Sequence, residues 1–161
     1  MGKIVIVGSG PAGCSAALYA ARAGQEVVVI SMGMGALSKA ELIQNYYGFE
    51  EGITGAELYR QGVAGAKAVG AEFITAEVVG LDYTGSLVVQ TTEGDYPADA
   101  VILATGAGRI APKIAGLAEH EGRGVSYCAT CDAFFYRGKT AAVLGSGEYA
   151  LHEVQALLPV A

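Results

Sequence analysis

The stretch Lys3-Ile-Val-Ile-Val-Gly8-Ser-Gly-Pro-Ala-Gly13 decides the fold. Its first five residues form a short, mostly β-branched run, which is typical of a parallel strand that is buried on both faces. Residues 12–23 are almost all helix formers, and Gly24 stands where a helix C-terminus is expected. A second apolar run over residues 27–30 completes a βαβ unit of about 30 residues. The sequence therefore predicts an α/β fold of the Rossmann type.

The glycines of this first turn follow the pattern Gly-x-Gly-x-x-Gly. With 24 glycines in 161 residues the pattern alone is weak, but here it lies between a buried strand and a helix. Gly8 permits the tight turn, Gly10 lets a pyrophosphate approach the backbone, and Gly13 lets helix and strand pack closely. The helix N-terminus adds free N–H groups and a partial positive charge. We predict a dinucleotide site here, with a purely structural glycine turn as the alternative.

One residue that such a site usually contains is missing. The acid that binds the adenosine ribose is expected at the end of the second strand, but that strand runs into Ser31 and the next carboxylate is Glu41. We expect Ser31, or the backbone of residues 33–37, to hold the ribose instead.

The remainder of the first half predicts a loop, a helix and an antiparallel meander. Residues 31–49 have little periodicity and favour a long loop with at most one helical turn. Thr54 and Glu57 form a capping-box pattern for a helix that ends near Val69. The elements expected after it are a short strand around Phe73, meander strands over residues 78–83, 87–92 and 96–98, and a buried strand over residues 100–104.

The C-terminal part repeats the N-terminal opening. Residues 140–144 predict a buried strand, Gly145-Ser-Gly147 a turn, and residues 148–158 a helix. Gly145, Gly147 and Ala150 match the three glycines of the first turn at one constant offset. This second turn suits a nicotinamide cofactor, and a relic of duplication is the alternative reading.

A domain boundary is expected between the two copies. Residues 107–124 contain several glycines, Pro112 and scattered charges without a strong period. We predict a dinucleotide-binding domain at residues 1–112 and a partial second nucleotide-binding domain at residues 113–161.

The cysteine pair Cys128-Ala-Thr-Cys131 is the strongest chemical signal in the second domain. Its i, i+3 spacing puts both sulfurs on one face of a helical turn, where they can bridge and where a helix N-terminus can lower the pKa of one thiol. This spacing favours redox exchange. A zinc site needs four ligands, and only Cys14, His120 and His152 remain to complete the set. Cys14 falls within the first predicted helix and His152 within the last, so we predict no metal. Asp132 can protonate a leaving thiolate, or it can simply cap the helix, and Cys14 is expected to be a buried packing residue.

Composition excludes several classes of protein. Sixteen acidic against ten basic residues give a net charge of −6 without any Lys or Arg run, which argues against nucleic acid. With 52% hydrophobic and 16% charged residues the chain is too apolar for disorder. Glycines interrupt the apolar opening, which argues against a signal peptide, and no run approaches the roughly 20 residues of a membrane span. Three cysteines are no disulfide framework, so we expect a cytoplasmic location.

Five stretches together resemble the low-molecular-weight thioredoxin reductases, which are pyridine nucleotide-disulfide oxidoreductases. They are Val7-Gly-Ser-Gly-Pro-Ala-Gly13, Asn45-Tyr-Tyr-Gly-Phe49, Ala104-Thr-Gly106, Gly122-Arg-Gly-Val-Ser-Tyr-Cys-Ala-Thr-Cys-Asp132 and Gly145-Ser-Gly147. The similarity extends over essentially the whole chain, and the cysteine block is its most specific part.

The resemblance implies a mechanism. FAD would bind the first glycine motif, Cys128 and Cys131 would form a redox disulfide, and Asp132 would act as the acid. Cys131 would face the flavin, and Cys128 would exchange with a thioredoxin-like protein. Electrons would come from NADPH or, as in some relatives, from ferredoxin. The residues implied to bind FAD are Gly8, Ser9, Gly10, Pro11, Ala12, Gly13, Ser31, Gly35, Ala36, Leu37, Asn45, Val78, Ala104, Thr105 and Gly106, with Gly145 and Gly147 for a nicotinamide cofactor.

The chain also departs from that family. Ala36 stands where glutamine is usual, and Glu148-Tyr149 is an unusual continuation of the second motif. The chain is about half the usual length and lacks both the rest of the nicotinamide domain and the returning segment that completes the FAD domain. We therefore expect a fragment, a shortened product or half of a homo-oligomer, and the alternative function is a flavin-binding module or an inactive remnant.

Overall fold

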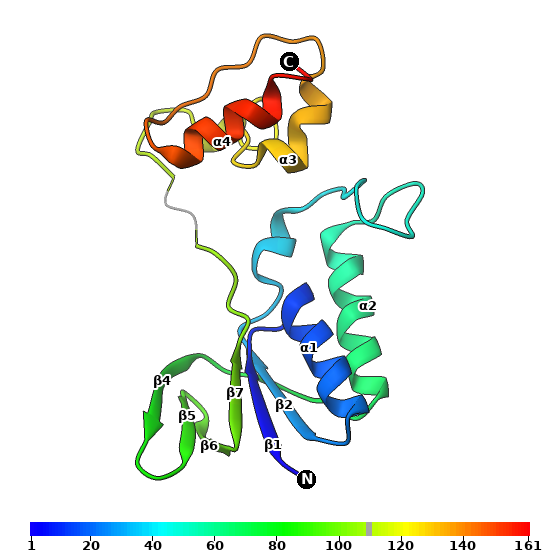
Figure 1. Ribbon diagram of the computed structural model, residues 1–161, viewed down its shortest axis with the longest axis vertical. Coiled ribbons are helices and arrows are strands. Elements are labelled where there is room, and N and C mark those ends of the chain that lie inside the picture. The colour runs from blue at the N-terminus through cyan, green and yellow to red at the C-terminus, as the bar shows by residue number, and fades with distance from the viewer. Residues whose placement is uncertain (109–110) are drawn as a thin grey trace. The chain divides into compact units, whose positions relative to one another are not determined.

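The structure is a computed structural model that describes residues 1–108 and 111–161. It divides into two compact units, residues 1–108 and 109–161 (Figure 1). Arg109 and Ile110, which belong to the boundary segment expected at residues 107–124, lie outside the described residues.

The first unit is built on a parallel four-stranded sheet in the order β3-β2-β1-β7. The central strands β1 (Lys3–Val7) and β2 (Glu26–Ser31) pair with Val5 opposite Val28. Strand β7 (Ala100–Leu103) pairs with the other side of β1, and β3 (Glu72–Thr75) pairs with β2. The predicted βαβ unit and its two buried strands are therefore confirmed.

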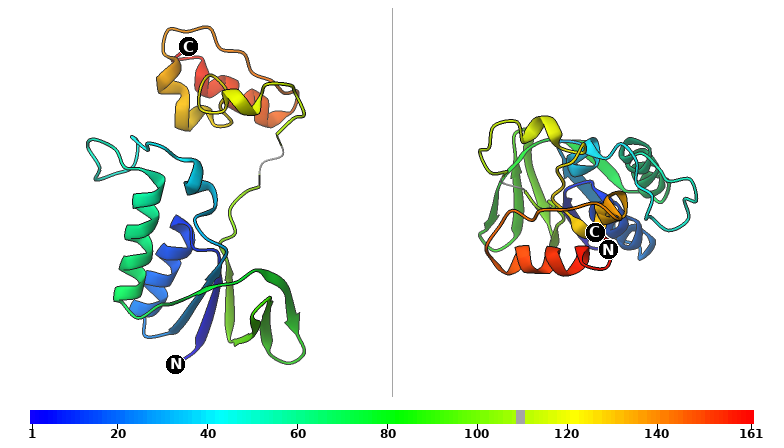
Figure 2. Two further views of the ribbon diagram at one scale, coloured as in Figure 1. Left: turned by 180° about the vertical axis from the view of Figure 1, so that it is seen from behind. Right: turned by 90° about the horizontal axis from the view of Figure 1, so that it is seen from above.

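The parallel sheet is covered on both faces, as Figures 1 and 2 show. Helices α1 (Pro11–Arg22) and α2 (Gly55–Ala68) cover one face. The predicted antiparallel meander, formed by β4 (Val78–Tyr83), β5 (Leu87–Thr91) and β6 (Gly94–Ala98), covers the other.

Alternate residues of the central strands enter two separate cores, because successive side chains of a strand point to opposite faces. Val5 packs with Val89 on the meander side, whereas Ile6 packs with Ala17 and Ala66 on the helix side. Burial on both sides explains why β1 shows no polar alternation in the sequence.

The segment between β2 and α2 positions the site. It contains one 3-10 turn, η1 (Gly35–Lys39), as the weak periodicity predicted. Thr54 is the N-cap of helix α2, and its hydroxyl accepts a hydrogen bond from the Glu57 amide at 3.2 Å. The amide of Gly55 donates to the Ala40 carbonyl at 2.8 Å and fixes η1 beside the start of α2.

The second unit is built from short helices. Its elements are η2 (Ala118–His120), α3 (Ala129–Asp132), η3 (Ala133–Tyr136) and α4 (Glu148–Leu157), the last of which confirms the predicted helix.

The strand predicted at residues 140–144 is wrong, because residues 140–146 adopt no regular secondary structure. A parallel strand forms only when a neighbouring strand supplies its hydrogen bonds. No such neighbour exists among residues 111–161, and Leu144 is 71% exposed.

No helix in the described part of the chain has the length and apolar character needed to span a membrane.

Candidate functional site

The carboxyl ends of β1, β2 and β7 meet at the first glycine turn. The amide of Gly8 donates to the Ile30 carbonyl at 2.8 Å, and the amide of Ala104 donates to the Val7 carbonyl at 2.8 Å. Gly8 has a φ of +108°, and a Cβ there would lie 2.3 Å from the Ala104 carbonyl oxygen. Only glycine therefore fits this corner of the sheet.

Gly13 and Gly10 differ in what surrounds them. A Cβ on Gly13 would lie 1.9 Å from the Gly8 carbonyl oxygen, so helix and strand touch there. A Cβ on Gly10 would meet nothing within 4 Å among the described residues. The first turn of α1 begins with Pro11 and contains no acidic side chain between Pro11 and Cys14. Its unpaired amides and positive helix end suit the pyrophosphate of a dinucleotide, which Gly10 allows to approach.

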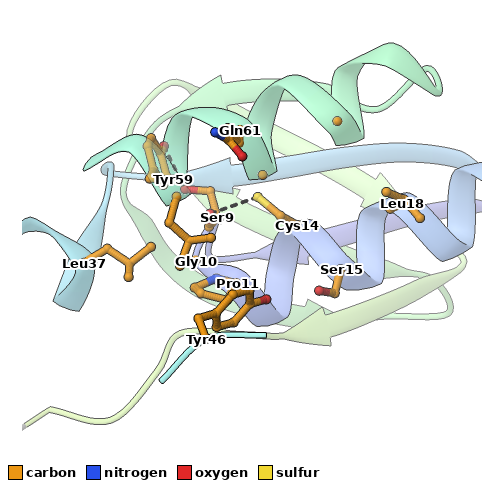
Figure 3. A pocket seen from close by; sticks show the side chains of 13 residues that line it. Ser9, Gly10, Pro11, Cys14, Ser15, Leu18, Leu37, Tyr46, Tyr59 and Gln61 are labelled. Atoms are coloured by element: carbon orange, nitrogen blue, oxygen red, sulfur yellow. Dashed lines mark hydrogen bonds between the residues drawn. The ribbon is translucent and has the colours of Figure 1, made fainter. Parts of the chain in front are cut away.

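A buried hydroxyl fixes the loops around this turn. Ser9 is 1% exposed, and its Oγ lies 2.6 Å from Ser31 Oγ. It also lies 3.1 Å from the Tyr59 hydroxyl (Figure 3). The same Oγ donates to the Gly33 carbonyl at 3.2 Å. Strand β1, the loop after β2 and helix α2 are thereby tied together. Ser31 is half-buried, and a hydroxyl with one such contact still has hydrogen-bonding capacity for a ligand.

A cavity of about 160 Å³ lies beside the glycine turn. It is smaller than the 300 to 1,000 Å³ typical of a small-molecule site, so it admits only part of a ligand. Its walls come from the glycine turn, α1, α2 and the loop between β2 and α2 (Figure 3). The residues that line it are Ser9, Gly10, Pro11, Cys14, Ser15, Leu18, Leu37, Tyr46, Leu58, Tyr59, Gln61, Gly62 and Gly65.

The other residues predicted to bind a dinucleotide lie at different distances from the turn. Gly35 and Ala36 are exposed in η1, and Asn45 is exposed one residue before Tyr46, outside the cavity lining. Thr105 and Gly106 continue from Ala104 on the surface. Val78 begins β4, just after Ala76, whose amide donates to the Ser31 carbonyl at 3.2 Å.

Cys128 and Cys131 are joined by a disulfide, with their Cα atoms 5.3 Å apart. Cys128 is the N-cap of α3, and its Sγ accepts the Cys131 amide at 3.2 Å. Both sulfurs are used in this bond, and no group of three or more His, Cys, Asp or Glu side chains among residues 1–108 and 111–161 is placed to hold a metal ion.

Ser126 links Asp132 to the cysteine turn. Its Oγ lies 2.5 Å from Asp132 Oδ2 and accepts the Cys128 amide at 3.1 Å. Asp132 is therefore held beside the sulfurs by a side chain as well as by its own amide, which donates to the Cys128 carbonyl at 3.1 Å.

The sequence that carries both the glycine turn and the cysteine pair matches one protein family. The family model for pyridine nucleotide-disulphide oxidoreductases matches residues 2–158. The chain belongs to this family. The family assignment agrees with the resemblance that the glycine and cysteine motifs carry.

Individual relatives are thioredoxin reductases. The bifunctional thioredoxin reductase/thioredoxin of Mycobacterium leprae is 46% identical, with 94% of this chain and 34% of that protein aligned. The thioredoxin reductase of Streptomyces coelicolor is 40% identical, with 94% of this chain and 48% of that protein aligned. The chain thus spans between a third and a half of these relatives.

Solved structures agree with this family fold. A thioredoxin reductase from Streptococcus pyogenes superposes with a TM-score of 0.87 at 36% identity, covering 98% of this chain and 52% of that one. The enzyme from Giardia duodenalis gives 0.90 at 30% identity, covering 99% and 53%.

The second glycine turn resembles the first in its own backbone and in the helix that follows it, but residues 140–144 before it form no strand. Gly147 is the N-cap of α4 with ψ −178°, as Gly10 is the N-cap of α1 with ψ −174°. A Cβ on Gly145 would lie 2.9 Å from the Ala150 Cβ, so the close approach seen between Gly13 and Gly8 recurs here in part. The turn and helix form without the strand that precedes them in the first copy.

Three contacts of the candidate site were not predicted from the sequence. Tyr59 reaches Ser9 from α2, fifty residues away, and no local pattern marks it. Glu153 accepts the Ala129 amide from α4, and it reads in the sequence as one more acid of an amphipathic helix. Ser126, only two residues before Cys128, is the one missed contact that its position could have suggested.

We expect the third cysteine to be unreactive. Cys14 is 6% exposed, its Sγ donates to the Ser9 carbonyl at 3.1 Å, and burial raises the pKa of its thiol. Because the thiolate is the nucleophile, native reduced chain treated with iodoacetamide at pH 8 should label Cys128 and Cys131 well before Cys14. Peptide mass spectrometry over a time course checks this, and labelling of Cys14 at the rate seen in urea would contradict it.

Proposed function

We propose that this chain is the FAD-binding and disulfide-carrying part of a thioredoxin-reductase-like flavoprotein. Residues 1–112 are proposed to form the FAD domain and residues 113–161 to carry the redox pair. The observation that carries the proposal is the Cys128–Cys131 disulfide, present in the same chain as a glycine turn at which a Cβ on Gly8 or Gly13 would collide with backbone carbonyl oxygens.

The residues at the first turn fit FAD. Gly10 leaves room for the pyrophosphate, and the first amides of α1, from Ala12 and Gly13, are free to donate to it. Ser31 is proposed to hydrogen-bond the ribose in place of the missing acid. Bound FAD supplies two-electron redox chemistry at this site, and the protein supplies binding and orientation.

The cysteine pair then passes electrons to a protein disulfide. In the reduced pair, the Cys128 thiolate attacks one sulfur of a thioredoxin-like partner, breaking its disulfide and forming a mixed disulfide. Cys131 next attacks Cys128 Sγ, which restores the Cys128–Cys131 bond and releases the partner as a dithiol. The two electrons and two protons lost by the pair are those gained by the partner. Asp132, whose Oδ2 accepts the Ser126 hydroxyl, is proposed to hold a proton for this exchange.

The electron donor is proposed to be a reduced nicotinamide dinucleotide. The glycine turn before α4 has the same N-cap backbone as the first turn, which supports a second nucleotide. A reduced ferredoxin is the other donor implied by the resemblance. Anaerobic addition of each donor to FAD-loaded chain, followed by bleaching of the flavin band, distinguishes them.

Titration with FAD tests the proposal directly. The purified chain should bind FAD and acquire a visible absorption band. Ser31→Ala should raise the dissociation constant about five- to tenfold, the equivalent of one hydrogen bond of about 1 kcal/mol. Ser86→Ala, in the exposed turn of the meander, is the matched control and should bind normally. A chain that stays colourless with added FAD would refute the proposed function.

A further inference from the structure

Helix α4 contributes a carboxylate to the cysteine turn. Glu153 Oε2 accepts the amide of Ala129 at 2.5 Å, and the Glu153 side chain is only 13% exposed. Ala129 is the first residue of α3 and follows Cys128 directly. A largely buried carboxylate that does not take part in the proposed electron transfer thus binds the residue next to Cys128, whose sulfur is proposed to attack the partner.

Two interactions at this turn oppose each other in their effect on a Cys128 thiolate. The Cys131 amide donates to Cys128 Sγ at 3.2 Å, which favours negative charge on that sulfur. The Glu153 carboxylate accepts the amide of Ala129, the residue that follows Cys128, and a negative charge at this position disfavours a second negative charge on the Cys128 sulfur.

We propose that Glu153 is a positioning residue that fixes the start of α3 and, through its charge, disfavours the Cys128 thiolate, so that the reduced pair gives up its electrons more readily. The inference rests on the proposed function of the pair. Reduction breaks the Cys128–Cys131 bond and adds two electrons and two protons. An environment that destabilises the reduced form makes the pair a stronger reductant, which suits transfer to another protein disulfide.

Other titratable groups surround the turn and stay unchanged in the test. His152 Nδ1 lies 3.7 Å from Glu153 Oε1, and the Tyr149 hydroxyl donates to the Tyr127 carbonyl at 3.3 Å. The groups on the elements packed against α3 are Asp132 on α3 itself, Tyr127 before it, Tyr136 on η3, and Glu148, Tyr149, His152 and Glu153 on α4.

The test compares Glu153→Gln with the unaltered chain. Glutamine can still accept the Ala129 amide, so α3 keeps its start while the charge is lost. The measurement equilibrates the full chain with mixtures of reduced and oxidised dithiothreitol, the two-electron donor, and quantifies free thiols by alkylation. Loss of a like charge at this partly exposed site should favour the Cys128 thiolate of the reduced pair. The equilibrium should then shift toward the dithiol by about tenfold at pH 9, equal to about 30 mV, and by less than about twofold at pH 7.

Only the thiolate form of reduced Cys128 feels the negative charge of Glu153. Removing that charge therefore stabilises the reduced state only at pH values where the thiolate is populated, so the difference in equilibrium between the variant and the unaltered chain must grow with pH. A residue with a merely structural role would change the equilibrium equally at both values. Glu148→Gln, on the exposed first turn of the same helix, removes the same charge without this contact and should leave the equilibrium unchanged.

Two results would overturn the inference: equal equilibria for Glu153→Gln and the unaltered chain at pH 9, or an equal shift in Glu148→Gln. Glu153→Ala supplies a second check, because it removes the acceptor as well as the charge and should also increase protease cleavage near residue 129. None of these measurements needs FAD, so a failure of the proposed function, seen as absent FAD binding, is distinguished from a failure of this inference.

Discussion

In a chain carrying Cys131→Ser, reaction with an oxidised thioredoxin-like protein is expected to stop at the mixed disulfide. Cys128 still attacks the partner, but no second sulfur is present to break the new bond, because serine cannot form a disulfide. The unaltered chain, reduced beforehand, should instead release the partner as a dithiol. Non-reducing electrophoresis detects the covalent complex, and counting the released thiols measures turnover.

Cys128→Ser is the matched control, because it leaves one sulfur in the same turn. Cys128 caps α3 and is proposed to be the attacking group, so this variant should give little covalent complex. Both variants should bind FAD like the unaltered chain, because the proposed FAD residues lie in the first unit. Full release of the partner by Cys131→Ser, or equal trapping by the two variants, would contradict the assigned roles.

Gly13→Ala is expected to destabilise the first unit and abolish FAD binding. Alanine inside a helix is normally favoured by about 1 kcal/mol over glycine. Here its Cβ would lie 1.9 Å from the Gly8 carbonyl oxygen, so α1 must move away from the sheet. Overpacking of this kind costs about 1 to 3 kcal/mol. Urea unfolding followed by circular dichroism should show a lower midpoint.

Gly10→Ala separates binding from folding. Its added methyl group would meet nothing within 4 Å of the described residues, so the unfolding midpoint should change little. The same methyl group would occupy the approach to the helix N-terminus and should raise the FAD dissociation constant about tenfold or more. Equal unfolding midpoints for the two variants would show that the contact at Gly13 does not hold α1 in place.

The sequence predicted those elements whose cause is local. The helix formers of α1 and the Thr54 cap depend on neighbouring residues, and both are confirmed. The apolar run of β1 is confirmed as well, because β2 and β7 are present to pair with it. The turn and helix at Gly147 were predictable for the same reason. The strand at residues 140–144 failed because a parallel strand depends on partners elsewhere in a sheet, which its own residues do not encode.

Some residues of the candidate site could be predicted from the sequence, and others could not. Spacing marked the cysteine pair, and spacing together with the flanking strand and helix marked the glycine turn. The hydroxyl contact between Ser9 and Tyr59, and the carboxylate that Glu153 brings to Ala129, join residues that are far apart in the chain. Such contacts follow from how helices pack, and a single sequence carries no signal for them.

The side-chain hydrogen bonds described above for the cysteine turn join residues between Ser126 and Glu153. The two sulfurs, Asp132 and Glu153 therefore lie within one short stretch of the chain. Recombination that moves residues 126–153 as one block between flavoproteins would keep these contacts together, whereas a crossover between α3 and α4 would separate the sulfurs from the Glu153 carboxylate.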